Sequence, residues 1–239
     1  MQPTLTQDAF NKLQEYANHS GQVLNKKKTI LLPISERIDH PKFYITTQEG
    51  DIIRESKECK FLGINLTTKP NLNHHNEKTM VKAKQRIWIL RNLKRAGVNA
   101  KDLSAVYIAM IRSLFDYCAQ VHSVMSGSTM KSRMEAVQTK ALRVIHGFDI
   151  GREEMRLRSN ITTLEEHHRK MTIKFVEKAL DNERFKHWFP QRENPYLGIL
   201  RTPKLIEETN AKSQRLYTAP IYAYRRIANE LLHQKQLHV

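Results

Sequence analysis

The spacing of apolar and polar positions changes at about residue 70. In the first seventy residues, Phe10, Leu13 and Ala17 share one face of a helix that we expect over residues 8–19. Short apolar runs typical of strands follow, together with a Gln-Glu-Gly-Asp turn sequence. We expect the strands at residues 29–34, 42–46, 52–53 and 60–66. The pattern therefore predicts a small antiparallel sheet with one helix.

From Asn73 onward the apolar positions recur every three or four residues, which is typical of amphipathic helices. The first stripe is Met80, Ala83, Ile87 and Leu90, and Gly97 is expected to end that helix. Further helices are expected over residues 99–118, 127–147, 162–181 and 220–234. Prolines at 190, 195 and 203 predict an irregular connection before the last helix.

The predicted fold class is α+β and mostly α. A small antiparallel sheet with one helix comes first, a helical bundle follows, and an irregular tail ends in a closing helix. We expect three parts, at residues 1–70, 71–150 and 151–239.

Charge is distributed unevenly over these parts. The 239 residues hold 40 Lys and Arg against 24 Asp and Glu, a net charge of +16. The three parts carry net charges of +2, +8 and +6, so the excess begins near residue 71. Such a field favours a polyanionic partner, either nucleic acid or an anionic membrane surface. The alternative is that the cations only solvate helix faces.

Composition limits the class of protein further. The chain has no run of about 18 apolar residues and no basic-then-apolar start, so neither a membrane span nor a secretory signal is expected. Two cysteines, Cys59 and Cys118, are too few for a disulfide framework or a multi-cysteine zinc site. We expect an intracellular protein, nuclear or cytoplasmic, that is neither secreted nor in the membrane.

The helix that begins at Asn73 carries a second stripe, formed by Lys84, Trp88, Arg91 and Arg95. Three cations around one aromatic side chain could follow phosphates while the indole stacks or packs on sugar. Alternatively, Trp88 lies in the core and the cations extend around it. Lys140 and Arg143, with Lys131 and Arg133, could extend the same track on a later helix, or form a solvated surface spread over more than one face.

Five stretches follow one another in order along nearly the whole chain. They are residues 13–29, the Lys-Phe-Leu-Gly-Ile sequence at 60–64, residues 83–97, residues 137–147, and Pro190, Arg192 and 215–225. Together they resemble the C-terminal part of a non-LTR (LINE-type) retrotransposon reverse transcriptase: the first two resemble the end of its palm, the next two its thumb, and the last its C-terminal extension. The chain departs from the family at His122, where a tryptophan is usual.

This resemblance implies nucleic-acid-binding roles for two places in the first part. Phe61, Leu62 and Gly63 resemble the primer grip, a hairpin that holds the primer backbone; the alternative is an ordinary buried strand with a packing glycine. Lys28 matches a family lysine beside the active site, although a solvated run of three lysines at 26–28 also fits. The implied partner is an RNA or DNA primer–template duplex, bound non-specifically.

The same family uses paired carboxylates to hold divalent ions. This chain has seven aspartates, none adjacent to another, and no aromatic-x-Asp-Asp sequence. We therefore expect a truncated, reverse-transcriptase-like RNA-directed DNA polymerase fragment without catalytic residues, and not an enzyme. No cofactor is expected, since Mg²⁺ would serve only the missing catalytic half.

Two other functions remain open. The chain could be a helical interaction module that docks on a separately encoded polymerase half, or a non-functional retrotransposon remnant. Adjacent histidines at 74–75 and 167–168 suggest a metal site at first sight, but neighbours on a helix point in different directions and no cysteine lies at ligand spacing. We expect surface histidines and no metal.

Overall fold

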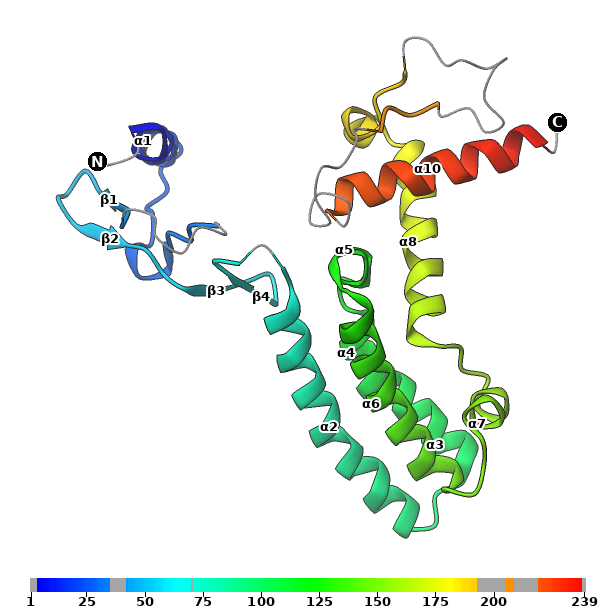
Figure 1. Cartoon of the computed structure of the whole chain (residues 1–239). Helices are drawn as coiled ribbons and strands as arrows, with labels where there is room; N and C mark the ends of the chain where they lie inside the picture. Colours follow the sequence, from blue (N-terminus) through cyan, green and yellow to red (C-terminus); the bar gives the residue numbers. More distant parts are fainter. Residues whose placement is uncertain (1–3, 35–41, 70, 193–204, 209–218, 238–239) are drawn as a thin grey trace. The chain divides into compact units, whose positions relative to one another are not determined.

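The computed structural model describes residues 4–34, 42–69, 71–192, 205–208 and 219–237 (Figure 1). The chain divides into two compact units, residues 1–75 and 76–239. Helices dominate and the strands form antiparallel hairpins, so the predicted α+β, mostly α class is confirmed. The three-part division of the chain stays a prediction.

In the first unit, helix α1 (Thr4–His19) packs on a hairpin of β1 (Tyr44–Thr46) and β2 (Ile52–Arg54). Phe10 and Ala17 of the helix and Ile45 of β1 are buried. The side chain of Gln7 accepts a hydrogen bond from the Thr46 amide and donates one to the Thr46 carbonyl, both at 2.8 Å. A helix side chain thus satisfies the backbone of a short strand edge.

The expected strand at 60–66 is wrong, because these residues form a second hairpin. Strands β3 (Glu58–Phe61) and β4 (Ile64–Thr67) pair across a two-residue turn. Leu62 and Gly63 there have φ of 45° and 83°, the positive values that such a turn requires. The expected strand at 29–34 is also wrong, since Leu31 makes only an isolated bridge to Glu55. The strands therefore form two separate two-stranded sheets.

Helices make up the second unit, and α2 begins at its boundary. They are α2 (Asn73–Arg95), α3 (Ala100–Tyr107), the π-helical turn η2 (Ile108–Arg112), α4 (Ser113–Asp116), α5 (Ala119–Met125), α6 (Ser128–His146), α7 (Arg152–Ser159), α8 (Leu164–Leu180), the 3-10 helix η3 (Glu183–Trp188) and α10 (Pro220–Leu237). The helix expected over 99–118 is wrong as one element, because a π turn interrupts it and it ends at Asp116. The first residues after it are extended Tyr117 and left-handed Cys118 (φ 54°).

The remaining predicted helices are confirmed within a few residues at their ends. Thr163 caps α8 as a capping box, in which its side chain accepts from the Glu166 amide and the Glu166 carboxylate accepts from the Thr163 amide. Helices α5 and α7 and the helix η3 lie where no element was predicted. Residues 193–204 of the predicted irregular connection lie outside the described residues.

Two apolar cores stabilise the second unit. The larger one joins α2, α3, η2, α4, α6, α7 and the start of α8, and includes the predicted stripe Met80, Ala83, Ile87 and Leu90. The smaller one joins α8, η3 and α10 around Val176, Phe189 and Tyr224. Most of the stability of these helices comes from such packing, since isolated helices of this length are marginal in water.

A buried hydrogen bond crosses the larger core. The Tyr107 hydroxyl donates to Oε1 of Gln138 at 2.6 Å, and the Gln138 amide donates to the Thr162 carbonyl at 3.1 Å. Both side chains have 0% exposure. Burial raises the pKa of the Tyr107 phenol well above its usual range, so the group stays a donor.

We expect Tyr107→Phe to lower the free energy of unfolding by about 1–3 kcal/mol, because it leaves the buried Gln138 oxygen without this donor. Urea unfolding followed by far-ultraviolet circular dichroism measures the change. Tyr16→Phe, on the exposed surface of α1, is the matched control. Equal stability of the two variants would contradict a stabilising role for the bond.

Candidate nucleic-acid interface

One side of α2 is fixed in the core, and this determines what its other side presents. Ala83, Ile87 and Leu90 are buried. Lys84, Arg91 and Arg95 are exposed on the neighbouring side, and Trp88 among them is 63% exposed. The interpretation that placed Trp88 in the core is wrong. Its indole lies at the surface among three cations.

Helix α6 lies beside that side of α2. Arg133 of α6 forms an ion pair with Glu77 of α2 at 3.2 Å, and Lys94 of α2 donates to the Ile145 carbonyl of α6 at 2.9 Å. The two helices therefore run in the same direction (Figure 1). Glu77, Lys84 and Arg91 are spaced seven residues apart, about two turns, so the cations lie on the side of α2 that borders α6.

Two of the predicted residues on α6 lie at the same border. Lys140 comes seven residues after Arg133, which places it on the side of α6 next to α2, and Arg143 is one turn further on. Lys140 is exposed and Arg143 is half-buried. Lys131 points elsewhere, since it pairs with Glu165 of α8 at 2.8 Å. We call the set Lys84, Trp88, Arg91, Arg95, Lys140 and Arg143 the α2–α6 face.

The cations of the α2–α6 face have no acidic partner among the described residues. Within the part of the chain that the structure describes, none of the five forms an ion pair. Some other cations of this unit do: Arg133 with Glu77, Lys131 with Glu165, and Arg169 with Glu230. The face therefore keeps its positive charge unneutralised by the protein.

The other predicted site residues lie in the first unit. Lys28 is exposed at the end of the 3-10 helix η1 (Lys26–Lys28), where its amide donates to Oδ1 of Asn25 at 3.2 Å. Lys26, in the same run, pairs with Glu49 and Asp51. Phe61 and Leu62 are exposed at the β3–β4 turn, so the interpretation of this place as an ordinary buried strand is wrong. A primer-grip role for Phe61, Leu62 and Gly63 stays a prediction.

A further cationic row was missed in the sequence. Lys170, Lys174 and Lys178 are exposed on α8, one turn apart, and no ion pair is formed by them among the described residues. Their spacing of four residues is a signal that the sequence carries. The row has no aromatic member, which separates it from the α2–α6 face.

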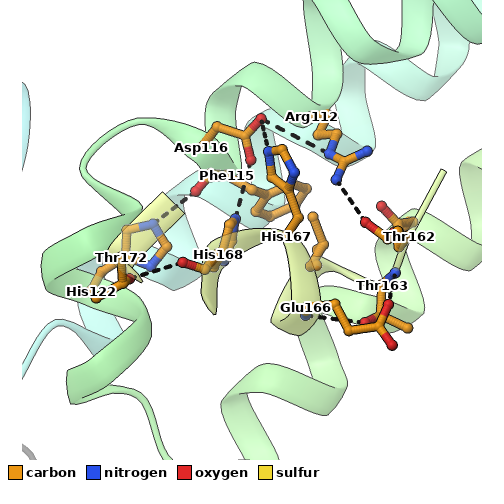
Figure 2. A network of polar contacts seen from close by, with 12 residues as sticks. Arg112, Phe115, Asp116, His122, Thr162, Thr163, Glu166, His167, His168 and Thr172 are labelled. Carbon is orange, nitrogen blue, oxygen red and sulfur yellow. Dashed lines mark hydrogen bonds and ion pairs between the residues drawn. The ribbon is translucent and has the colours of Figure 1, made fainter. Parts of the chain in front are cut away.

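Figure 2 shows the polar network that joins the α4 end to α8. His168 donates from Nε2 to Oδ1 of Asp116 at 3.2 Å, and Nε2 of His167 lies 3.3 Å from Oδ2. Buried Arg112 places Nε 3.9 Å from Oδ2 of Asp116 and donates from Nη2 to the Thr162 hydroxyl at 3.5 Å. One carboxylate thus compensates a buried guanidinium and orients two imidazoles.

His122 extends this network toward α5. It is buried, donates from Nε2 to the Phe115 carbonyl at 2.8 Å, and meets His168 edge-on with ring centroids 5.5 Å apart. The expectation of surface histidines is wrong for His75 and His168, which are both buried. No group of three His, Cys, Asp or Glu side chains that could hold a metal ion occurs among the described residues.

Comparisons with known proteins give no assignment. No protein-family model, no curated protein and no solved structure matches this chain. Within the described residues, no helix has both the length and the apolar character to cross a membrane.

Two histidines are expected to make the stability of the helical unit depend on pH. Burial lowers the pKa of His167 and the nearby Arg112 lowers it further, against a smaller opposing effect of Asp116. Burial likewise lowers the pKa of His146, with Arg158 and Lys94 adding to it. At pH values between the lowered pKa of these histidines and the ordinary histidine pKa of about 6.5, the two side chains bind more protons in the unfolded chain than in the folded one.

Stability should therefore fall as the pH falls through about 6.5. His146→Gln and His167→Gln should each flatten this dependence, and the double variant should flatten it further. Urea unfolding at a series of pH values measures the slope. A double variant that keeps the slope of the unsubstituted protein would contradict this assignment.

Proposed function

We propose that this protein binds nucleic acid non-specifically through the α2–α6 face. The observation that carries the proposal is one exposed tryptophan flanked by three unpaired cations on α2, with two more unpaired cations on the side of α6 next to α2. Lys and Arg side chains that contact phosphates release condensed counterions, and this supplies most of non-specific affinity. An intracellular place of action, in the nucleus or cytoplasm, belongs to the same proposal.

The proposal extends to the resemblance with the C-terminal part of a non-LTR reverse transcriptase. Its support is the order of the resembling stretches and an α+β segment followed by helices. A primer–template duplex is the partner that this resemblance implies. The sequence has no pair of adjacent aspartates, so we propose a fragment that binds nucleic acid and does not polymerise.

A second candidate function is a module that docks on a separately encoded polymerase half. One observation favours it: the first unit exposes large apolar side chains on α1 and on both hairpins. They are Leu5, Leu13, Tyr16, Tyr44, Ile52, Phe61 and Leu62. Ionic strength separates the two functions, because binding to phosphates weakens steeply with salt and apolar docking does not.

Charge reversal tests the binding face. The triple variant Lys84→Glu, Arg91→Glu, Arg95→Glu should weaken binding to a short DNA duplex and reduce the slope of log affinity against log salt by about 3, one for each lost phosphate contact. Fluorescence anisotropy over a salt series gives both quantities.

The row on α8 supplies a control with the same change in net charge. Lys170→Glu, Lys174→Glu, Lys178→Glu removes three exposed cations from a face without an aromatic residue. This variant should lose less affinity than the triple variant on α2. Equal losses would mean that net charge alone attracts the duplex, and would overturn the assignment to the α2–α6 face.

The purified chain should not extend a primer on an RNA or DNA template with Mg²⁺ or Mn²⁺ present, since it lacks the paired carboxylates. A gel-based extension assay with a complete reverse transcriptase as the positive control measures this. Extension by the chain itself would contradict the proposal.

A further inference from the structure

The position of Trp88 suggests more than general affinity for phosphates. Tryptophan is the largest apolar side chain, and surrounding it with water rather than with core residues is unfavourable. The chain contains a second tryptophan, Trp188, which packs with Phe175, Phe185 and Tyr224 in the smaller core. Trp88 has no such neighbours, although the same chain offers a packed site for an indole.

The side chain of Trp88 is 63% exposed and carries none of the ring contacts that hold Trp188. Among the described residues no aromatic ring and no cation lies against the Trp88 indole, and its Nε1 donates no hydrogen bond. Lys84 precedes it by one turn and Arg91 follows it by one turn, about 6 Å and 4.5 Å along the helix axis. The exposed tryptophan therefore has one cation a turn before it and another a turn after it on the same helix.

A ligand for this arrangement must present a flat ring between negative charges. An unpaired nucleotide does so, because its base has a free face and phosphates lie on both sides of it. In a duplex each base is covered above and below by its neighbours, so an indole on a helix surface reaches only the backbone and groove edges. Stacking on Trp88 thus requires an unpaired base.

We propose that Trp88 is a stacking platform for an unpaired base, with Lys84 and Arg91 holding the adjacent phosphates. The α2–α6 face then binds single-stranded nucleic acid, or the unpaired end of a template, in preference to a duplex. This inference rests on the proposed function and specifies its substrate. Arg95 lies about two turns beyond Trp88 and one turn beyond Arg91, and it extends the phosphate track by one position.

Two substitutions at the same position separate stacking from apolar contact. Trp88→Leu keeps an apolar side chain without a ring, and Trp88→Phe keeps a smaller ring. Affinity for a short oligothymidylate should fall by about 5- to 100-fold in the leucine variant and much less in the phenylalanine variant. Affinity for a duplex of the same length, at the same salt concentration, should not change in either.

Tryptophan fluorescence gives an independent readout. Oligothymidylate should quench the emission of the unsubstituted protein more than that of Trp88→Phe, which retains only Trp188, and duplex should not produce this difference. Circular dichroism and thermal unfolding check that the variants fold, as expected for a side chain outside the core.

The outcomes separate this inference from the proposed function. If Trp88→Leu loses affinity for oligothymidylate and not for the duplex, the result supports the stacking platform. An equal loss of affinity for both ligands, or no loss for either, overturns it. The proposed function survives these outcomes if the triple variant Lys84→Glu, Arg91→Glu, Arg95→Glu binds the duplex more weakly than the unsubstituted protein does. An unsubstituted protein that binds neither ligand at low salt overturns both.

Discussion

Burial of one apolar stripe of α2 is the constraint on which the rest of the structure depends. Ala83, Ile87 and Leu90 contribute to a core shared with the helices that follow, and this burial sets the rotation of α2 about its own axis. With the rotation fixed, a residue one or two positions away along the sequence points to a defined side. The exposure of Trp88 and its three cationic neighbours is thus a consequence of packing and not of local preference.

The placement of ion pairs then decides where the net charge of +16 acts. Arg112 is compensated inside the fold by Asp116, and Arg133 and Arg169 are compensated at the surface by Glu77 and Glu230. Exposed pairs of this kind add little stability, yet they cancel the local field. The unpaired cations of the α2–α6 face leave a positive surface that contains an exposed aromatic residue, a combination typical of proteins that bind single-stranded nucleic acid.

Periodicity in the sequence was enough to predict the fold class, the start of α2 and the extent of α6. It was not enough for short helices that lack a repeating apolar pattern or a capping residue. Helix α7 buries only Met155, and α5 starts after a left-handed Cys118 with no capping side chain. A strand-like run of residues 60–66 became a hairpin because Leu62 accepts a positive φ, which its residue type does not favour.

Helical spacing also made part of the α2–α6 face predictable from the sequence. Four residues on one helix share a face by spacing alone, whereas the ambiguity between a buried and an exposed Trp88 depends on which side the core covers. The pairing of Arg133 with Glu77 and the network around Asp116 join residues about fifty positions apart, so no local pattern encodes them. The Arg133–Glu77 pair brings Lys140 and Arg143 beside α2, and the pair of Lys131 with Glu165 removes Lys131 from the face.

Photo-cross-linking with mass spectrometry tests the central claim most directly. A short oligonucleotide that carries a photoreactive thymidine analogue is irradiated with the full chain, and the linked peptides are identified. The account predicts cross-links concentrated on α2 between Lys84 and Arg95, with further ones on α6 near Lys140. Cross-links confined to the first unit or to α8, with none on α2, would contradict it.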